Sequence, residues 1–309
     1  SHLKIFPPIL DLYHSAGSVT IFKKYLWGSE TMLIPVAQGI SMVAPKEKPR
    51  YPYANCLFIN ADRPTVIDLG AGAGAFREIA CERIQLVLLT HFHFDHVHGY
   101  DLFSHADLMA GQEEAATYCD EHAYVDFHGY NLWDELMKIP RQAYGQVVPL
   151  KDDVLARPGF RKLPLAATIS DGQNIELGSM NLTAVHLPGH TRGHYGFYIE
   201  KEGILFSGDI DLVASGPWYS SNSASVGDLI NSVRRIKEIN PRITIPSHRH
   251  IQSDNIPAQL DRYIGVVLDR NYRLLDILRI PHNLDQLAEY HLVFPNCQNV
   301  YELFWEKMT

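Results

Sequence analysis

Short apolar runs separated by turn residues dominate the chain between about residues 30 and 210. Runs of this length, rich in valine, isoleucine, phenylalanine and tyrosine, are typical of strands in packed sheets. We expect a strand at 32–43, interrupted by Pro35 and Gly39. The turn 61–64 predicts a hairpin between the strands on either side of it. Further strands are expected at 55–60, 65–69, 86–89, 107–110, 175–177, 181–186, 197–200 and 204–207.

Helical spacing replaces this pattern in the last third of the chain. Within 226–239 apolar residues recur at every third or fourth position, which indicates a helix with one apolar face. Residues 256–309 are also strongly helical: an apolar stripe runs from Leu260 to Leu278, and Asn283 is a typical capping residue before a further helix. The remaining expectations are a strand at 243–245 and helices at 76–83, 96–105, 112–121, 283–290 and 300–305.

Three segments leave two interpretations open. Residues 18–27 fit either a short amphipathic helix or a strand. The proline-rich loop 45–52 is either a plain surface connection, which we favour, or a border of a substrate pocket. Residues 122–170 look irregular, and their aromatic rings either form a wall of the substrate site or pack as a satellite core. The residues concerned are Tyr124, Phe127, Tyr130, Trp133 and Tyr144, together with His122 and His128, which we expect to be ordinary surface or hydrogen-bonded residues.

Composition narrows the class of protein. The chain has 309 residues, 46% hydrophobic and 20% charged, with a formal net charge of −8, which suits one large globular domain or a domain with an appendage. No basic run indicates nucleic-acid binding, and no apolar stretch approaches the ~18–20 residues of a membrane span. Four scattered cysteines without a C-x-x-C pair favour free thiols in a reducing cytosol, so we expect a cytoplasmic protein with a small-molecule substrate.

The chemistry is concentrated just after the expected strand 86–89. Four histidines and an aspartate follow within nine residues, and burying such groups without partners costs several kcal/mol. A divalent metal supplies the partner, because imidazole with carboxylate suits zinc, iron or manganese. The first two histidines can converge from one side of an extended loop, and the following Asp-His pair could face a second ion. These residues are His91, His93, Asp95, His96 and His98.

The order of motifs resembles one known family. The segment 91–96 reads H-x-H-x-D-H, and it is followed by Pro-Gly-His-Thr at 188–191, Ser-Gly-Asp at 207–209 and Pro-Ser-His at 246–248. This series is similar to that of the metallo-β-lactamase-fold hydrolases, including glyoxalase II-like and lactonase-like enzymes, over about residues 30–250. The family usually has a glycine where His98 stands, so we expect His98 to lie behind the ligands or to face the pocket.

The resemblance implies a fold and a domain organisation. The fold class is α+β, a four-layer αβ/βα sandwich with a C-terminal helical extension. Residues 1–255 would form the catalytic domain, with an insertion at about 122–170, and residues 256–309 would form helices packed on it. This extension could also shape the pocket mouth or the interface of a homodimer.

The resemblance also implies a dinuclear metal centre. Two divalent ions, zinc first and iron or manganese as alternatives, would activate a water that attacks a carbonyl of a lactone, thioester or amide/β-lactam substrate. Asp95 would in addition orient the nucleophile or carry its proton, and Asp68 would be a structural carboxylate beneath the metals. His248 is preferred to His250 because it follows Pro246-Ser247 directly. The first ion would take His91, His93 and His190, the second would take Asp95, His96 and His248, and Asp209 would bridge them.

Two other functions of the same fold remain as alternatives. A mono-iron sulfur dioxygenase would leave the site of the second ion empty. All the residues expected to hold that ion are present in the sequence, which argues against a dioxygenase. A phosphodiesterase or nuclease finds no support in the acidic composition. Trp218 and Tyr219, downstream of Asp209, weakly indicate an apolar acyl or ring group in the substrate; packing of a buried loop is the simpler explanation for both.

Overall fold

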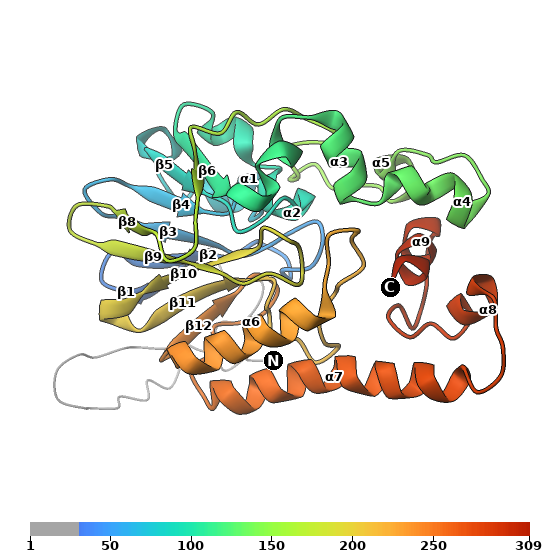
Figure 1. The fold of residues 1–309 in the computed structure, drawn as a ribbon. Helices are drawn as coiled ribbons and strands as arrows, with labels where there is room; N and C mark the ends of the chain where they lie inside the picture. The colour runs from blue at the N-terminus through green and yellow to red at the C-terminus, as the bar shows by residue number, and fades with distance from the viewer. Residues whose placement is uncertain (1–30) are drawn as a thin grey trace, which may run out of the picture.

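The computed structural model describes residues 31–309, so the segment 18–27 lies outside the described residues. Two β-sheets face each other, and helices cover the outer face of each sheet (Figure 1). This is the four-layer α+β sandwich that the motifs imply. Within residues 31–309, every helix is too short or too polar to pass through a bilayer.

The first sheet holds seven strands in chain order. The first three pairs of neighbouring strands are antiparallel, and the last three pairs are parallel. The expected single strand at 32–43 is in fact a hairpin, because Gly39 adopts a φ of 73° that lets the chain turn back between two strands. The strands are β1 (Leu33–Ala37), β2 (Ile40–Val43), β3 (Cys56–Ile59), β4 (Thr65–Ile67), β5 (Leu86–Leu88), β6 (Asp107–Gly111) and β7 (Ala167–Ile169).

The second sheet holds five strands in the order β12-β11-β10-β9-β8. All its pairs are antiparallel except β11 with β12, which a helical crossover joins in parallel. The expected strands are confirmed here to within two residues at each end. They are β8 (Asn174–Glu176), β9 (Asn181–His186), β10 (Tyr195–Ile199), β11 (Ile204–Gly208) and β12 (Ile243–Pro246).

Side chains that alternate along the strands build two cores. In β5, Leu86 and Leu88 point between the sheets, whereas Val87 points to the outer helices. A strand that is buried on both faces needs an unbroken apolar run, which explains why 86–89 has one. From the opposite sheet, Phe197 and Phe206 fill the space between the sheets. The strands are therefore held rigidly where they end, and the candidate ligands follow those ends.

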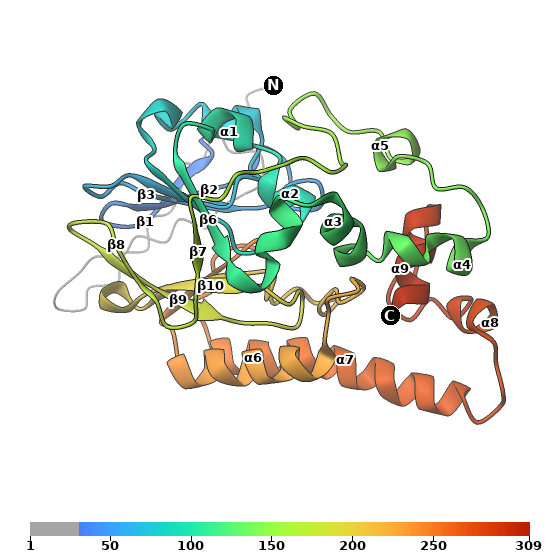
Figure 2. The ribbon, with the colours of Figure 1, turned by 45° about the horizontal axis from the view of Figure 1, so that its top comes forward.

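Helices form the two outer layers, as the turned view in Figure 2 shows. Helix α6 (Val226–Ile239) has the bounds that its apolar spacing predicts and packs with α7 (Ile256–Ile277) on the five-stranded sheet. Shorter helices cover the seven-stranded sheet. These are α1 (Ala73–Phe76), α2 (Phe94–Val97) and α3 (Glu121–Phe127), with the 3-10 turns η1 (Cys81–Arg83), η2 (Tyr100–Phe103) and η3 (Gln112–Tyr118).

The helices expected at 76–83, 96–105 and 112–121 are therefore wrong in their length. The second of them breaks at Gly99, whose N–H donates to the carbonyl of Leu69 at 3.0 Å. A Cβ on Gly99 would lie 2.4 Å from the same oxygen, so the close approach of two backbones requires glycine there. The contact joins segments about thirty residues apart, and helical spacing alone carries no signal for it.

A satellite core joins the 122–170 segment to the C-terminal helices. Trp133 and Tyr144 pack against Tyr301 and Phe304, and burial of each ring stabilises the contact by on the order of 2 kcal/mol. The satellite-core interpretation therefore holds for Trp133 and Tyr144, while Tyr124 and Phe127 belong to the layer over the first sheet. The elements involved are η4 (Tyr130–Leu132), α4 (Trp133–Met137), α5 (Tyr144–Val147), α8 (Leu284–Ala288) and α9 (Val300–Met308).

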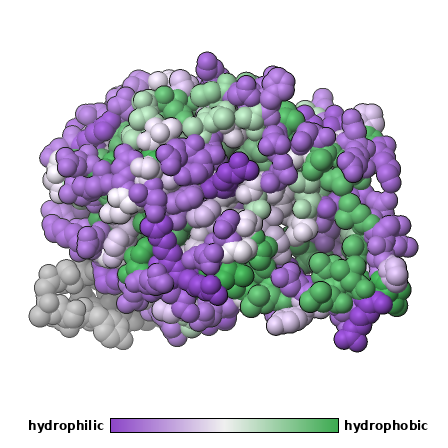
Figure 3. Space-filling model, viewed as in Figure 1, coloured by the Kyte–Doolittle hydropathy of each residue, from purple (hydrophilic) through white to green (hydrophobic). Residues whose placement is uncertain are grey.

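The far end of α7 carries exposed apolar side chains. Tyr272 is 71% exposed and Leu275 is exposed as well, as are Ile280 in the following loop and Leu284 at the start of α8. Green side chains gather at the lower right of Figure 3, over this end of α7 and over α8.

Candidate metal centre

The candidate ligands meet at one edge of the sandwich, where strands of both sheets end. His91 and His93 follow β5, and Asp95 and His96 begin α2. Asp209 follows β11 directly. His190 comes from the turn between β9 and β10, and His248 follows β12. The rigid strands thus bring together side chains that lie up to 157 positions apart in the sequence (His91 to His248).

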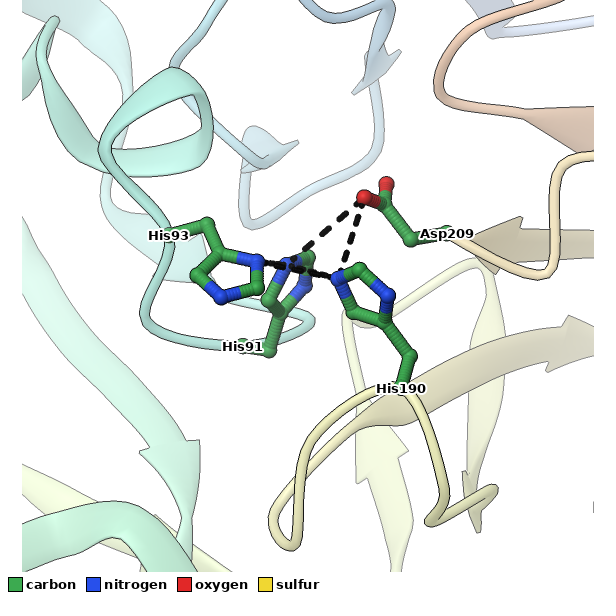
Figure 4. A group of neighbouring side chains, drawn as sticks. All are labelled: His91, His93, His190 and Asp209. Atoms are coloured by element: carbon green, nitrogen blue, oxygen red, sulfur yellow. Dashed lines mark hydrogen bonds and ion pairs between the residues drawn. The ribbon is translucent and has the colours of Figure 1, made fainter. Parts of the chain in front are cut away.

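His91, His93, His190 and Asp209 form a first group (Figure 4). Nδ1 of His93 lies 2.8 Å from Nε2 of His91 and 2.9 Å from Nε2 of His190. Oδ2 of Asp209 lies 3.2 Å from Nε2 of His190 and 3.9 Å from Nε2 of His91. Four potential ligand atoms therefore surround one point.

Asp95, His96 and His248 form a second group beside the first. Oδ1 of Asp209, the other oxygen of the same carboxylate, lies 3.1 Å from Nε2 of His96 and 3.3 Å from Nε2 of His248. Oδ2 of Asp95 lies 3.4 Å from Nε2 of His248. Asp209 therefore stands between the two groups and turns one oxygen towards each.

Hydrogen bonds on the outer side of the rings decide where the protons sit. Nδ1 of His190 donates to the carbonyl of Trp218 at 2.9 Å, and Nδ1 of His248 donates to the carbonyl of Pro49 at 3.2 Å. Nδ1 of His96 donates to Oδ2 of Asp68 at 2.7 Å. These acceptors have no proton to give, so each ring carries a proton on Nδ1, and in its neutral form it turns the lone pair of Nε2 inwards.

This arrangement fits divalent cations. Inward lone pairs repel one another unless a cation lies between them, and imidazole with carboxylate is the donor set of zinc, iron and manganese sites. Among the described residues, three buried polar atoms also lack a hydrogen bond of ordinary geometry: Nε2 of His93, and Nε2 of His96 and Oδ1 of Asp209, which face each other at 3.1 Å. Such atoms are costly to bury alone, and coordination would satisfy Nε2 of His96 and Oδ1 of Asp209, which face the second group.

The two groups differ in their protonation. Burial, reinforced by neighbouring imidazoles, lowers the pKa of His91 and His93 well below its usual value, which keeps these rings neutral. Burial alone would lower the pKa of His248 too, but the charge of Asp209 outweighs it and raises this pKa to about 9. Burial alone would raise the pKa of Asp209, yet the imidazoles around it lower that pKa well below its usual value.

The motif order and the fold agree with one family. A sequence model described as the metallo-beta-lactamase superfamily matches residues 51–248, which is more than half of the chain. The chain belongs to this superfamily. A solved metallo-beta-lactamase family protein from Thermus thermophilus shares the fold, with a TM-score of 0.69 and 21% identity over 88% of this chain and 91% of that one.

Two curated relatives within the superfamily have named activities. Hydroxyacylglutathione hydrolase GloC of Haemophilus influenzae is 29% identical over 50% of this chain and 66% of its own length. Acyl-coenzyme A thioesterase MBLAC2 of Homo sapiens is 31% identical over 43% of this chain and 44% of its own length. The chain thus matches less than two thirds of the length of these relatives.

Asp68 positions His96 in this superfamily member. The side chain of Asp68 is fully buried and accepts hydrogen bonds from the backbone N–H and the hydroxyl of Thr90, both at 2.8 Å, and from His96. The backbone of Asp68 has a φ of 60°, a left-handed conformation that aspartate tolerates better than most residues. Asp68 is thus a structural carboxylate next to the ligands, where such partners orient metal-binding histidines.

Three further positioning residues were not predicted from the sequence. Glu114 is buried and accepts from the N–H groups of Phe92 and Gly193, so it ties the 91–93 loop to the 190–194 loop. Asn55 donates to the carbonyls of Pro246 and Arg249 on either side of His248. His194 accepts from the N–H of Asp209 at 3.0 Å. His194 was visible as an extra histidine four positions after His190, whereas Glu114 and Asn55 had no local signal.

The other histidines take different places. Nε2 of His98 donates to the carbonyl of Gly70 at 3.2 Å, and its ring lies behind the second group against Phe94. His128 donates to the carbonyl of Tyr124 at 2.9 Å, which agrees with an ordinary hydrogen-bonded role. His122 is exposed. The half-buried His250 is in neither group of potential ligands among the residues 31–309.

The proposed substrate-side residues differ in their surroundings. The ring of Trp218 is 5.1 Å from that of His93 and 5.5 Å from that of His190. Tyr219 is buried, and the guanidinium of Arg270 lies 5.6 Å from its ring. These surroundings agree with a residue that packs in a buried loop. The loop 45–52 is more than a surface connection, because its Pro49 carbonyl accepts the hydrogen bond of His248.

Proposed function

We propose that the chain is a dinuclear metal-dependent hydrolase that cleaves a thioester of a small molecule. The observation that carries this proposal is the carboxylate of Asp209, whose two oxygens face two separate groups of ligands. A single carboxylate can bridge two ions because it has two donor oxygens. An isolated buried carboxylate between five histidines would otherwise have no evident role.

The ligand sets follow from these groups. His91, His93 and His190 would hold the first ion, and Asp95, His96 and His248 would hold the second, with Asp209 shared. Zinc is our first choice because it binds histidine nitrogen and carboxylate oxygen and its d-electrons impose no fixed geometry. Iron and manganese are alternatives. Two such ions would supply an activated water and a Lewis acid for the substrate carbonyl.

The residues of the chain have distinct tasks. Asp95 is 4% exposed, and its Oδ2 faces His248. Its carboxylate can hold the attacking water in line and accept the proton that this water loses. The Nδ1 hydrogen bonds of His96, His190 and His248 keep their rings from rotating, so the ligand cage does not have to reorganise during the reaction.

The thioester is supported by the two curated relatives. Glutathione and coenzyme A are both thiols, so both names describe the hydrolysis of a thioester. A thiolate also leaves more readily than an amine, because it needs no protonation at neutral pH. Lactones and β-lactams remain alternative substrates of the same machinery. A mono-iron sulfur dioxygenase is disfavoured because His96, His248 and Asp95 complete the second group.

A parallel assay tests this proposal. The purified protein is stripped with a chelator, reloaded with zinc, manganese or iron(II), and offered acyl thioesters, lactones and a β-lactam, with oxygen uptake on a persulfide recorded beside them. We expect metal-dependent release of thiol from the thioester, abolished in Asp209→Ala. Oxygen uptake supported by one iron per chain, without thiol release, would instead identify the dioxygenase.

A further inference from the structure

Five aromatic side chains form a continuous series of ring contacts beside the candidate metal centre. Tyr51 lies 6.1 Å from Phe94 and 5.3 Å from Tyr144, measured between ring centroids. Tyr144 lies 6.1 Å from Trp305, and Trp305 lies 5.8 Å from Trp218. We call these five residues the aromatic collar. They come from the 45–52 loop, α2, α5, the loop after Asp209, and α9.

Both ends of the collar reach the candidate ligands. Trp218 lies within 5.5 Å of the rings of His93 and His190. At the other end, Tyr51 contacts Phe94, and its pKa is raised by burial and by the nearby charges of Tyr144 and Asp95. This end of the collar therefore lies near Asp95 of the second group. A substrate carbonyl at the metal centre would have its acyl group within reach of these rings.

The C-terminal helix holds its part of the collar firmly. The ring of Trp305 packs against Phe294 at 6.1 Å and against Tyr301 at 5.9 Å. Nζ of Lys307 donates to the carbonyl of Leu136 at 2.7 Å. The hydroxyls of Thr309 and Ser220 are hydrogen-bonded, which ties the end of α9 to the loop that carries Trp218. These contacts of α9 therefore fix the position of the Trp305 ring.

The collar keeps apolar surface in contact with solvent. Tyr51 is 40% exposed, and Phe94, Trp218 and Trp305 are only half-buried. Tyr144, which also belongs to the satellite core, is buried and joins Tyr51 to Trp305. An apolar chain laid across them would remove this surface from water, which is favourable in proportion to the area covered.

We propose that the aromatic collar binds the acyl group of the substrate, that this group is a medium- to long-chain apolar acyl chain, and that Trp305 determines the preference for it. The inference rests on the proposed thioester hydrolysis and names its substrate class. A short polar hydroxyacyl group would leave the collar largely uncovered. The collar thus favours apolar acyl chains within the thioester class.

A chain-length series tests this preference. Acyl thioesters of N-acetylcysteamine from acetyl to decanoyl are hydrolysed by the metal-loaded protein, and kcat/KM is measured for each. We expect kcat/KM to rise with length, by up to about fourfold for each methylene that contacts the rings. In Trp305→Ala the decanoyl-to-acetyl ratio should fall at least tenfold, mainly through KM. Trp305→Phe should retain most of the ratio.

The control variant is Tyr290→Ala, which removes a 44%-exposed ring elsewhere on the C-terminal extension and should leave the ratio unchanged. A wild-type preference for the acetyl ester, or a loss in Trp305→Ala that is equal at every length, would overturn the collar proposal. Thermal unfolding of each variant shows whether α9 stays docked; if Trp305→Ala unfolds, Trp305→Phe and Trp305→Leu carry the comparison.

Calorimetric binding of carboxylates separates this proposal from the proposed function. Decanoate and acetate share the carboxylate that can reach the metals, so the difference in their affinity reports the chain alone. We expect decanoate to bind at least tenfold more tightly than acetate, and Trp305→Ala to reduce this difference. Selective decanoate binding without any thioester hydrolysis would contradict the proposed function and leave the collar standing. Equal affinities would overturn the collar, whatever the enzyme hydrolyses.

Discussion

The backbone N–H of Asp209 donates a hydrogen bond to Nε2 of His194 at 3.0 Å. On the other side of the ring, Nδ1 donates to the carbonyl of Leu187 at 3.0 Å. Burial, with a contribution from His190, lowers the pKa of His194 to about 3, so the ring stays neutral and keeps both bonds. The loop that carries His190 therefore also fixes the residue that faces both groups of ligands.

We predict that His194→Phe destabilises the protein by about 2–6 kcal/mol, because two buried backbone groups lose their partners at ~1–3 kcal/mol each. It should also weaken metal binding, since Asp209 is no longer held. Urea unfolding and metal analysis measure both effects. His194→Gln is the matched control, because its amide has both a donor and an acceptor. A His194→Phe protein with wild-type stability and full metal content would contradict this role.

The kcat values of Asp209→Ala and His98→Ala should distinguish a proposed metal ligand from a residue that lies next to the ligands. Removal of Asp209 takes donors from both ions, and we expect kcat to fall by at least about 100-fold, beyond what loss of a residue behind the ligands costs. Among residues 31–309, the ring of His98 bonds to the carbonyl of Gly70 and not to a candidate ligand, so His98→Ala should keep its metals. Its loss in kcat should stay below the roughly tenfold or more that removing a ligand-orienting residue costs. Loss of metal binding in His98→Ala would show that the loop is assigned wrongly.

His128 should make the metal-free protein less stable in acid. Burial lowers its pKa to about 4, whereas the unfolded chain has the usual value near 6.5. The unfolded state therefore binds more protons between these values, and stability falls as the pH drops from 6.5 towards 4. From pH 7.5 to 5, His128 alone accounts for about 2 kcal/mol.

His128→Gln cannot titrate, but its amide can still donate to the carbonyl of Tyr124. Urea unfolding of the chelated proteins at pH 7.5 and pH 5 should show a smaller loss in the variant, by about the same 2 kcal/mol. The exposed His122 offers the matched comparison, and His122→Gln should lose as much stability as the wild type. An equal loss in His128→Gln and wild type would refute the assignment.

Local sequence patterns predicted the parts of the fold that local interactions determine. Helix α6 follows from its apolar spacing, and β5 follows from an apolar run buried on both faces. The loops of the candidate ligands were recognisable because histidine and aspartate at strand ends have few other uses. Even so, the sandwich itself came from the resemblance of four motifs, and periodicity alone does not imply it.

Contacts between distant segments were beyond these patterns. Asn55 bonds to Pro246, 191 positions away, and an asparagine just before a strand carries no sign of such a partner. Trp305 looked like part of one apolar helical patch, yet it completes a collar with four other segments. The loop 45–52 likewise contacts His248 through a carbonyl group, which its proline-rich sequence does not indicate. Each of these roles depends on tertiary proximity that the fold creates.

The last ligand of the second group can be tested by a pair of variants. Nε2 of His248 lies 3.3–3.4 Å from carboxylate oxygens of Asp209 and Asp95, while His250 belongs to neither group among the described residues. We predict that His248→Ala retains one ion per chain and loses most hydrolysis, and that His250→Ala retains two. The reverse order of metal contents would identify His250 as the ligand.

The metal content of the wild-type protein tests the central claim most directly. Seven side chains in two groups, joined by Asp209, predict two divalent ions per chain. Elemental analysis of protein that is purified without chelator, and again after reloading with zinc, manganese or iron, gives the number. The account predicts about two ions, with hydrolysis rising as the second ion binds. A content fixed at one, with no gain in activity on adding any of the three metals, would contradict it.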